Sequence, residues 1–479
     1  MRSFTGSLLA LALTVTIALA QTAPPAPDTA PAAPTAGAPA APRTPGGPGA
    51  PGAARATRPP TFSSAPQPVF PIPPAITKPV TFSCGAAKKG ATVLTASSVY
   101  SESAAGWDIK TTPKVEGGIC SSDKPFYFSM ALPEGNYRIT VAFGGNEESV
   151  NTVRTEARRL TLEGVAVKAK ATVTKSFDVN TRVAEFNNPD GTPNKVRLKS
   201  REYGNLNWDN KLTIEFNGTN PSFHSIEITP LVGAKAEPVV YLAGDSTMVD
   251  QDTDPGASWG QQLPRFFLPG IVIANHAESG ETSASFQGEL RFPKVMSVIK
   301  PGDYFFMQFN HNDQKPGAVP LDRYKEILAS FAAQVRAKGA TPVIVTAQHR
   351  RTFDASGHVT NSLADYPQAA RDVAAANNIA LIDLTAMSKV LYEAEGPEGA
   401  KHLFNGTDIT HFNNYGAYEL ARCVVHGIRE AKLPIAKFLD PTVPDFDPAK
   451  FDPFEKFALP GSPNGRRPGG PPLPVDDQL

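Results

Sequence analysis

Three features of the sequence predict a three-layer α/β/α domain built on a parallel sheet and preceded by an antiparallel β-sandwich. Residues 78–235 hold short runs in which apolar and polar residues alternate, whereas residues 237–432 hold compact apolar runs separated by helical stretches. The 47 prolines are concentrated toward the two ends of the chain. Alternation with period two is typical of half-buried strands, and alternating strands and helices are typical of a parallel sheet covered on both faces.

The first 20 residues have the pattern of a secretory signal peptide. Arg2 supplies a positive charge, and an apolar run from Leu8 to Ala20 ends in small residues before Gln21. This run is too short to cross about 30 Å of hydrocarbon comfortably, so we expect cleavage rather than a membrane anchor. The mature protein is therefore expected to be secreted or periplasmic, without a membrane span.

Two segments are poor in large apolar side chains. Residues 21–77 consist mostly of proline, alanine, glycine and threonine, which cannot bury enough surface to offset the entropy of ordering, so we expect a disordered linker. The tail, residues 433–479, is also rich in proline. Its first part carries five spaced phenylalanines that we expect to lie along the folded surface: Phe438, Phe446, Phe451, Phe454 and Phe457.

Residues 78–235 contain the expected strands of the sandwich. Clear examples are the runs 126–131, 137–143 and 211–216, with a turn at Pro133. Cys84 and Cys120 both fall in this region, and export would permit them to form a disulfide; two buried free thiols are the alternative, since the sequence does not give their separation.

Residues 237–432 contain the expected strands and helices of the α/β domain. The strands are expected at 239–243, 271–274, 304–309, 342–346 and 379–383, and two of the helices at 321–338 and 364–377. In open α/β sheets the ligand lies beyond the carboxyl ends of the strands, so we expect the functional residues directly after these runs.

Composition excludes several classes of function. The 46 basic and 46 acidic residues give a net charge of +0, and no run of lysine and arginine offers a nucleic-acid surface. The three cysteines are too few for a disulfide scaffold and lack the spacing of a structural zinc site. The sequence does not indicate the oligomeric state.

Residues suited to acyl transfer follow the predicted strands. Ser246 lies on a tight turn after the first run, Gly280 follows the second run and Asn312 follows the third. Near the end of the domain, Asp408 and His411 lie three residues apart on one loop, where the carboxylate can orient the imidazole as a base for the serine. Backbone N–H groups and the Asn312 amide could hold the developing oxyanion.

The chain resembles the SGNH (GDSL) hydrolase family, whose four blocks match at Ser246, Gly280, Asn312 and His411. The resemblance is strongest to rhamnogalacturonan acetylesterase-like carbohydrate esterases. They share the G-D-S-T string, the W-G pair at residues 259–260 and the closing string over 408–421. Residues 78–235 also resemble the galactose-binding-like β-sandwich that precedes the esterase in some members.

The resemblance implies two-step acyl transfer without a metal or a cofactor. Ser246 would attack an acetyl carbonyl, His411 would relay the proton and Asp408 would orient His411. The oxyanion would be held by the N–H groups of Ser246 and Gly280 and by the side-chain amide of Asn312.

Two positions depart from the family pattern. Asn310 replaces the usual glycine of the third block; asparagine tolerates positive φ, but its side chain would narrow the pocket. Glu281 stands where relatives more often carry a basic residue, which would disfavour acidic substrates.

Other side chains near these blocks have competing interpretations. His311 and Asp313 could suggest a metal site, but no further ligands stand at suitable spacing, and Asp313 is expected to anchor its loop. Trp259, Tyr203 and Trp208 are candidates for stacking on a sugar ring, with core packing as the alternative. Cys423 is expected to be a buried, inert thiol.

The leading functional hypothesis is a secreted serine esterase that removes acetyl groups from plant cell-wall polysaccharide, most specifically pectic rhamnogalacturonan. Its partner would be an acetylated polysaccharide or oligosaccharide. One alternative is a broader esterase for acetylxylan or small acyl esters. The other is a glycan-binding protein without catalysis. The presence of all five candidate residues argues against it: Ser246, Gly280, Asn312, Asp408 and His411.

Overall fold

The computed structural model describes residues 66–463 and residue 466 of the chain. The expected signal peptide and most of the expected linker lie outside the described residues. Residues 66–77 form no helix or strand, yet Leu198 N–H donates to Gln67 Oε1 (3.2 Å) and Asn210 Nδ2 donates to the Pro71 carbonyl (2.9 Å). The end of the predicted linker is therefore held against the folded chain.

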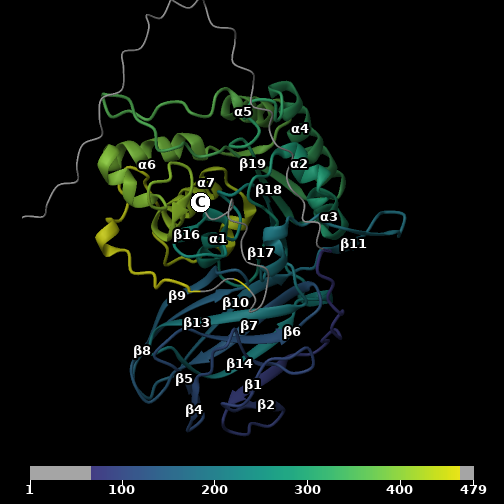
Figure 1. The fold of residues 1–479 in the computed structure, drawn as a ribbon, viewed down its shortest axis with the longest axis vertical. Helices are drawn as coiled ribbons and strands as arrows, with labels where there is room; N and C mark the ends of the chain where they lie inside the picture. Colours follow the sequence, from purple (N-terminus) through teal and green to yellow (C-terminus); the bar gives the residue numbers. More distant parts are fainter. Residues whose placement is uncertain (1–65, 464–465, 467–479) are drawn as a thin grey trace, which may run out of the picture. The chain divides into compact units, whose positions relative to one another are not determined.

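The β-rich region consists of two main sheets (Figure 1). The first has the order β10-β7-β14-β1-β2, with β5 added to β14 and β4 to β5. The second has the order β3-β6-β13-β8-β9, and every pairing in the two sheets is antiparallel except β1 with β2. The first sheet's strands are β1 (Val80–Cys84), β2 (Ala91–Leu94), β4 (Lys114–Glu116), β5 (Ile119–Ser121), β7 (Gly135–Phe143), β10 (Val173–Thr181) and β14 (Ser222–Pro230). The second sheet's strands are β3 (Gly106–Asp108), β6 (Phe126–Ala131), β8 (Ser149–Thr155), β9 (Arg159–Val167) and β13 (Lys211–Thr219); a separate hairpin pairs β11 (Glu185–Asn187) with β12 (Pro193–Lys195).

The two sheets share one hydrophobic core. In β7 the buried residues alternate with half-buried ones from Tyr137 to Phe143, as period two requires. The rings of Phe126 in the second sheet and Phe223 in the first lie stacked, with centroids 6.0 Å apart. Cys84 and Cys120 form a disulfide between β1 and β5, so these two residues are not free thiols.

The α/β region has a five-stranded parallel sheet in the order β17-β15-β18-β19-β20. Its strands are β15 (Val239–Gly244), β17 (Val272–Asn275), β18 (Tyr304–Gln308), β19 (Thr341–Val345) and β20 (Ala380–Ile382), and a small antiparallel pair joins β16 (Gly256–Ala257) to β21 (Phe412–Asn413). The helices are α1 (Trp259–Gln262), α2 (Ser283–Gly288), α3 (Arg291–Val298), α4 (Leu321–Ala337), α5 (Tyr366–Ala376), α6 (Leu384–Gly399) and α7 (Asn414–Glu430). The short 3-10 helices are η1 (Ser200–Gly204), η2 (Gly233–Lys235), η3 (Leu263–Phe266), η4 (Ala400–Leu403), η5 (Pro434–Phe438) and η6 (Phe454–Lys456).

Helices cover both faces of the parallel sheet. One core packs α1, α6 and α7 against it, and a second core packs α2, α3, α4 and α5 against the opposite face (Figure 1). The sequence prediction of a three-layer α/β arrangement is therefore confirmed, with the two named helices shorter at their ends by one to three residues. No helix within residues 66–463 is both long and apolar enough to cross a bilayer.

The described part of the tail contacts both regions. Phe446 is buried in the core of the α/β region, beneath the Arg422 guanidinium at 4.3 Å. Farther along, Asn217 Nδ2 donates to the Gly461 carbonyl (2.9 Å), and the Ser462 hydroxyl donates to Glu215 in β13. The tail thus runs from the α/β region back to the β-rich region.

Ion pairs also connect the two regions, and they cross in both directions. Arginines of the β-rich region reach acidic residues of the α/β region, and basic residues of the α/β region reach glutamates of the β-rich region. The pairs include Arg159–Asp250 (3.0 Å), Arg158–Asp254 (2.6 Å), Lys294–Glu134 (2.7 Å) and Arg291–Glu202 (2.6 Å).

Candidate active site

Ser246 stands on a tight turn at the carboxyl end of β15. The Asp245 carbonyl accepts hydrogen bonds from the N–H groups of Met248 and Val249, both at 3.0 Å, which reverses the chain directly after the strand. A Cβ on Gly244 would lie 2.7 Å from the Gln308 carbonyl oxygen, so only glycine fits before this turn. Ser246 is half-exposed between buried neighbours, which leaves its hydroxyl accessible.

A chain of hydrogen bonds joins Ser246 to the loop before α7. Ser246 Oγ lies 2.8 Å from His411 Nε2, and His411 Nδ1 lies 2.7 Å from Asp408 Oδ2. The other oxygen of Asp408 accepts the N–H groups of Thr410 (2.6 Å) and His411 (3.0 Å). Burial alone would raise the pKa of the Asp408 carboxyl, but the hydrogen bonds from His411 and these amides lower it below its usual value. The carboxylate is therefore ionised and fixed in orientation.

Gly280 and Asn312 are linked through Glu281. Asn312 Nδ2 donates to the Glu281 carbonyl (2.9 Å), and its Oδ1 accepts Lys315 Nζ (2.7 Å). An amide carries two N–H donors, and the bond to Glu281 uses one of them. Gly280 has a φ of +77°, and neither its N–H nor that of Ser246 has an acceptor among the described residues. This set of donors is suited to an oxyanion.

Comparison with known proteins places this site in a family. Residues 242–418 match the model of the GDSL-like lipase/acylhydrolase family. The rhamnogalacturonan acetylesterase RhgT of Bacillus subtilis is 42% identical over 216 residues, covering 42% of this chain and 93% of the relative. The chain belongs to the GDSL-like lipase/acylhydrolase family. It is a carboxylic ester hydrolase.

Two further proteins of Bacillus subtilis are similar to this chain. The probable rhamnogalacturonan acetylesterase YesY of Bacillus subtilis is 35% identical over 208 residues, covering 41% of this chain and 95% of the relative. The crystal structure of the protein YxiM of Bacillus subtilis covers 74% of this chain and 99% of its own, at 23% identity and a TM-score of 0.43.

The W-G pair of this GDSL hydrolase, Trp259 and Gly260, lies in α1 and supports the turn that carries Ser246. Trp259 Nε1 donates to Gln308 Oε1 (2.9 Å), and Gln308 Nε2 donates to Thr247 Oγ1 (2.7 Å). A Cβ on Gly260 would lie 2.2 Å from the Met248 carbonyl oxygen, so α1 packs directly on the turn. Trp259 is fully buried, so for this candidate the core-packing alternative holds rather than stacking on a sugar.

The other two candidate glycan residues pack inside the protein. Trp208 is buried, with the Arg182 guanidinium 4.5 Å from its ring centroid, so it offers no free face to a sugar. Tyr203 is half-buried and packs against the small cluster that contains Trp208. The core alternative therefore holds for Trp208, whose ring centroid lies 5.7 Å from that of His276 in the α/β region.

The structure also corrects two expectations about the departures from the family pattern. Glu281 is fully buried, pairs with Lys199 and lies 3.2 Å from Arg291, so its charge does not face a substrate. Burial opposes ionisation, but these two cations lower the pKa of Glu281 to about 2. Asn310 does not adopt positive φ, and its buried side chain donates to the Leu363 carbonyl (3.5 Å).

The loop that carries Asn312 is anchored from beneath. Asp313 Oδ1 accepts both the N–H (2.8 Å) and the hydroxyl (2.6 Å) of Ser283, as expected for an anchoring residue. Burial raises the pKa of Asp313 to about 7, and nearby Asp245 adds to the effect. His311 bonds through Nε2 to the Gln348 carbonyl (3.0 Å).

Among the described residues no cluster of three or more His, Cys, Asp or Glu could hold a metal ion. Cys423 is buried, and burial raises the pKa of its thiol well above the usual value.

Sequence reasoning missed three basic residues at this site. Lys199 and Arg201, from the β-rich region, both donate to the Ser279 carbonyl, directly before Gly280. Arg350 donates to the Thr410 hydroxyl and to the His311 carbonyl (3.3 Å), which ties the His411 loop to the Asn312 loop. No periodicity or motif in the sequence marks these residues, because their partners lie far away along the chain.

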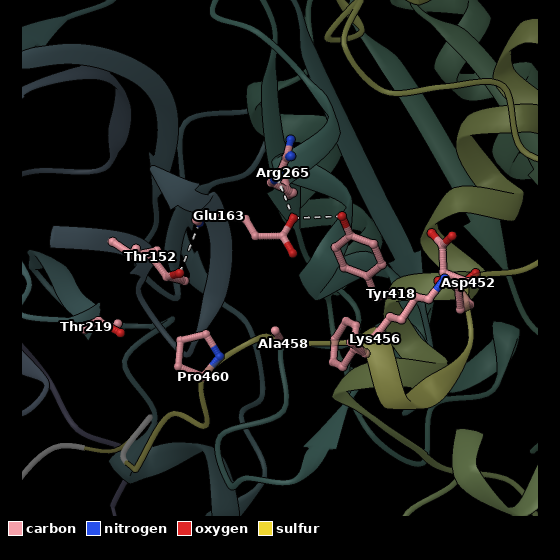
Figure 2. Close-up of a pocket in the computed structure, with 14 residues that line it drawn as sticks. Thr152, Glu163, Thr219, Arg265, Tyr418, Asp452, Lys456, Ala458 and Pro460 are labelled. Carbon is pink, nitrogen blue, oxygen red and sulfur yellow. Dashed lines mark hydrogen bonds and ion pairs between the residues drawn. The ribbon is translucent and has the colours of Figure 1, made fainter. Parts of the chain in front are cut away.

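A cavity of about 580 Å³ lies away from the serine (Figure 2). It is lined by residues of β8, β9, β13, η3, α7 and the tail, and none of Ser246, Asp408 or His411 lines it. Within it Glu163 pairs with Arg265 at 2.9 Å and accepts the Tyr418 hydroxyl at 2.8 Å. These contacts cross between the two regions.

Proposed function

We propose that this hydrolase is an exported carbohydrate acetylesterase that removes acetyl groups from pectic rhamnogalacturonan through an acetyl-enzyme on Ser246. The observation that carries the proposal is the hydrogen-bonded chain from Ser246 through His411 to Asp408. The 42% identity to an enzyme named a rhamnogalacturonan acetylesterase supports the choice of substrate.

In the proposed mechanism Ser246 Oγ attacks the acetyl carbonyl carbon while its proton passes to His411 Nε2. The tetrahedral oxyanion accepts hydrogen bonds from the N–H groups of Ser246 and Gly280 and from Asn312 Nδ2. The bond to the sugar oxygen then breaks, and that oxygen takes the proton from Nε2. Water then attacks the acetyl carbon while its proton passes to His411 Nε2. The bond from that carbon to Ser246 Oγ breaks, Oγ takes the proton back from Nε2, and acetate leaves. Asp408 stabilises the imidazolium and holds its tautomer throughout.

Two cations on the loops that carry the proposed catalytic groups support an acidic polysaccharide over a neutral one. Arg350 and Lys315 contact the two loops that carry the proposed catalytic groups, whereas the carboxylate of Glu281 is buried and paired. Positive charge on these loops would attract the carboxylates of a uronic-acid backbone. This supports pectin over acetylxylan as the substrate.

Export and the domain limits are also part of the proposal. The signal-like residues 1–20 and the disulfide between Cys84 and Cys120 both support an oxidising compartment. The chain changes from the β-rich to the α/β region between Pro230 and Val239, which supports domains at 78–235 and 237–432. We propose that the first domain, of galactose-binding-like type, serves as a scaffold for the second.

The test is acetate release from a panel of acetylated pectic rhamnogalacturonan, acetylxylan and a chromogenic aryl acetate. We expect the highest kcat/KM on rhamnogalacturonan and no release by Ser246→Ala, with an unchanged melting temperature. Hydrolysis by Ser246→Ala at the normal rate would refute the nucleophile. Higher kcat/KM on acetylxylan would instead assign the broader esterase activity.

A further inference from the structure

The loop that carries Gly280 is held by a segment of the other region. The segment Lys199–Gly204 precedes β13 in the β-rich region, and two of its side chains reach the same backbone oxygen. Lys199 Nζ donates to the Ser279 carbonyl at 3.0 Å, and Arg201 Nη2 donates to it as well. A single carbonyl oxygen therefore accepts hydrogen bonds from two cations.

The carboxylates on either side of this peptide are held by the same two cations. Arg201 Nε donates to Glu278 Oε1 at 2.8 Å, and Lys199 Nζ pairs with Glu281. Both glutamates are buried, so each charge depends on its partner. The turn from Glu278 to Glu281 is also closed by a backbone hydrogen bond of 3.2 Å between its ends.

Planarity of the peptide carries this restraint to Gly280. In a trans peptide the carbonyl oxygen and the N–H of the next residue point in opposite directions. Fixing the Ser279 oxygen toward the β-rich region therefore turns the Gly280 N–H away from it. Glycine accepts either sign of φ, so the central peptide of this turn can flip between type I and type II geometry unless something holds it in the observed one. Charge-assisted hydrogen bonds are about twice as strong as neutral ones, so two of them are an effective hold.

We propose that Lys199 and Arg201 are positioning residues for the oxyanion hole: they fix the Gly280 N–H, so that the β-rich region completes the active site of the α/β region. The inference rests on the proposed function, because it takes Gly280 N–H as an oxyanion donor. Residues 242–418, which match the family model, contain neither cation.

The test measures kcat and KM for a chromogenic aryl acetate in Arg201→Met, Lys199→Met and the double variant. We expect kcat to fall about tenfold in each single variant and about 10²–10³-fold in the double variant, the usual loss for one missing oxyanion donor. KM should change less than twofold, because the ground-state ester does not need the donor. Inhibition by a boronic acid, which forms a tetrahedral adduct with the serine, should weaken by the same factor as kcat, and Arg201→Lys should recover part of the loss.

A matched control separates positioning from a loosened junction. Glu163→Gln removes the charge from another ion pair between the two regions, Glu163–Arg265, while the amide oxygen still offers an acceptor to the Tyr418 hydroxyl (Figure 2). We expect its kcat to stay at the wild-type value even where its melting temperature falls. An equal loss of kcat in this variant would overturn the proposal.

A second variant serves if Arg201→Met does not fold because Glu278 is left unpaired. The double substitution Arg201→Met with Glu278→Gln leaves no buried charge unpaired and no donor at residue 201, and we expect the same loss of kcat. Wild-type kcat in the folded variants, while Ser246→Ala is inactive, would refute the positioning role alone. Absence of esterase activity in the wild-type protein would refute the proposed function itself.

Discussion

At the scale of single residues, the structure gives the hydrogen-bond partner of each polar atom in the proposed triad. The two oxygens of Asp408 have separate partners: Oδ1 accepts two backbone N–H groups, and Oδ2 accepts the imidazole. Because the two oxygens have different partners, the orientation of an asparagine side chain at residue 408 can be predicted.

We predict that Asp408→Asn lowers kcat by about 10⁴-fold, as in other triads. The backbone amides of Thr410 and His411 need an acceptor, so the amide oxygen takes the Oδ1 position and the NH₂ group faces His411 Nδ1. Nδ1 must then accept, which leaves Nε2 protonated and unable to act as the base. The melting temperature should hardly change; a parallel loss of stability and activity would make Asp408 a structural residue instead.

Asp313 gives a prediction about pH. Its folded pKa, raised to about 7 by burial, lies above the unfolded value of about 3.9, so the folded state binds more protons between these values. The free energy of unfolding therefore falls as pH rises from about 4 to 7, by up to about 4 kcal/mol at about 1.4 kcal/mol per pKa unit.

The substitution Asp313→Asn should remove this pH dependence while keeping an acceptor for Ser283. Urea unfolding at pH 5 and pH 8 measures it: the variant should lose less stability than the wild type between the two. An identical loss in both proteins would show that Asp313 does not titrate in this range.

At the scale of elements, the serine turn depends on helix α1 beneath it. Gly260 allows the backbone of α1 to contact the Met248 carbonyl, where a Cβ would lie at 2.2 Å. We predict that Gly260→Ala displaces the turn, lowers the free energy of unfolding by about 1–3 kcal/mol and reduces kcat. Urea unfolding and kcat for an aryl acetate check this, and a variant with both values unchanged would contradict it.

The elements of the α/β region could be predicted because their signals are local. Each apolar run, each helical stretch and each motif after a strand stands in one stretch of sequence. Parallel pairing then brings together the strand ends that carry Ser246, Gly280 and Asn312. Asp408 and His411 lie on the loop before α7 instead, and their spacing and the family pattern made them candidates.

The contacts of individual side chains could not be predicted in the same way. The charge of Glu281 is paired with Lys199, which lies in the β-rich region. Trp208 and Trp259 have the type of ring that stacks on sugars, but both side chains are buried in the core. Residue type limits what a side chain can do, and only the packing decides its exposure.

At the scale of the whole molecule, the tail connects the regions and satisfies buried groups. The carbonyl of Pro460 accepts a hydrogen bond from Arg154, the carbonyl of Gly461 accepts one from Asn217, and the Ser462 hydroxyl donates to Glu215. We predict that ending the chain at residue 458 lowers the free energy of unfolding by about 1–3 kcal/mol for each buried group left unsatisfied.

A chain ending at residue 466 is the matched control, because it keeps every described contact of the tail. Thermal unfolding of both truncated proteins beside the wild type measures the difference. Equal melting temperatures for the two truncations would show that the tail contacts do not contribute to stability.

The ion pairs that cross the junction in both directions have a consequence for how such enzymes are recombined. Attaching residues 237–432 to an unrelated carrier would leave Asp250, Glu278 and Lys294 facing a surface with no matching charge. A gene fusion that transfers the α/β region would therefore have to transfer the β-rich region with it. Otherwise the charged residues of the α/β region that pair with the β-rich region would have to be redesigned.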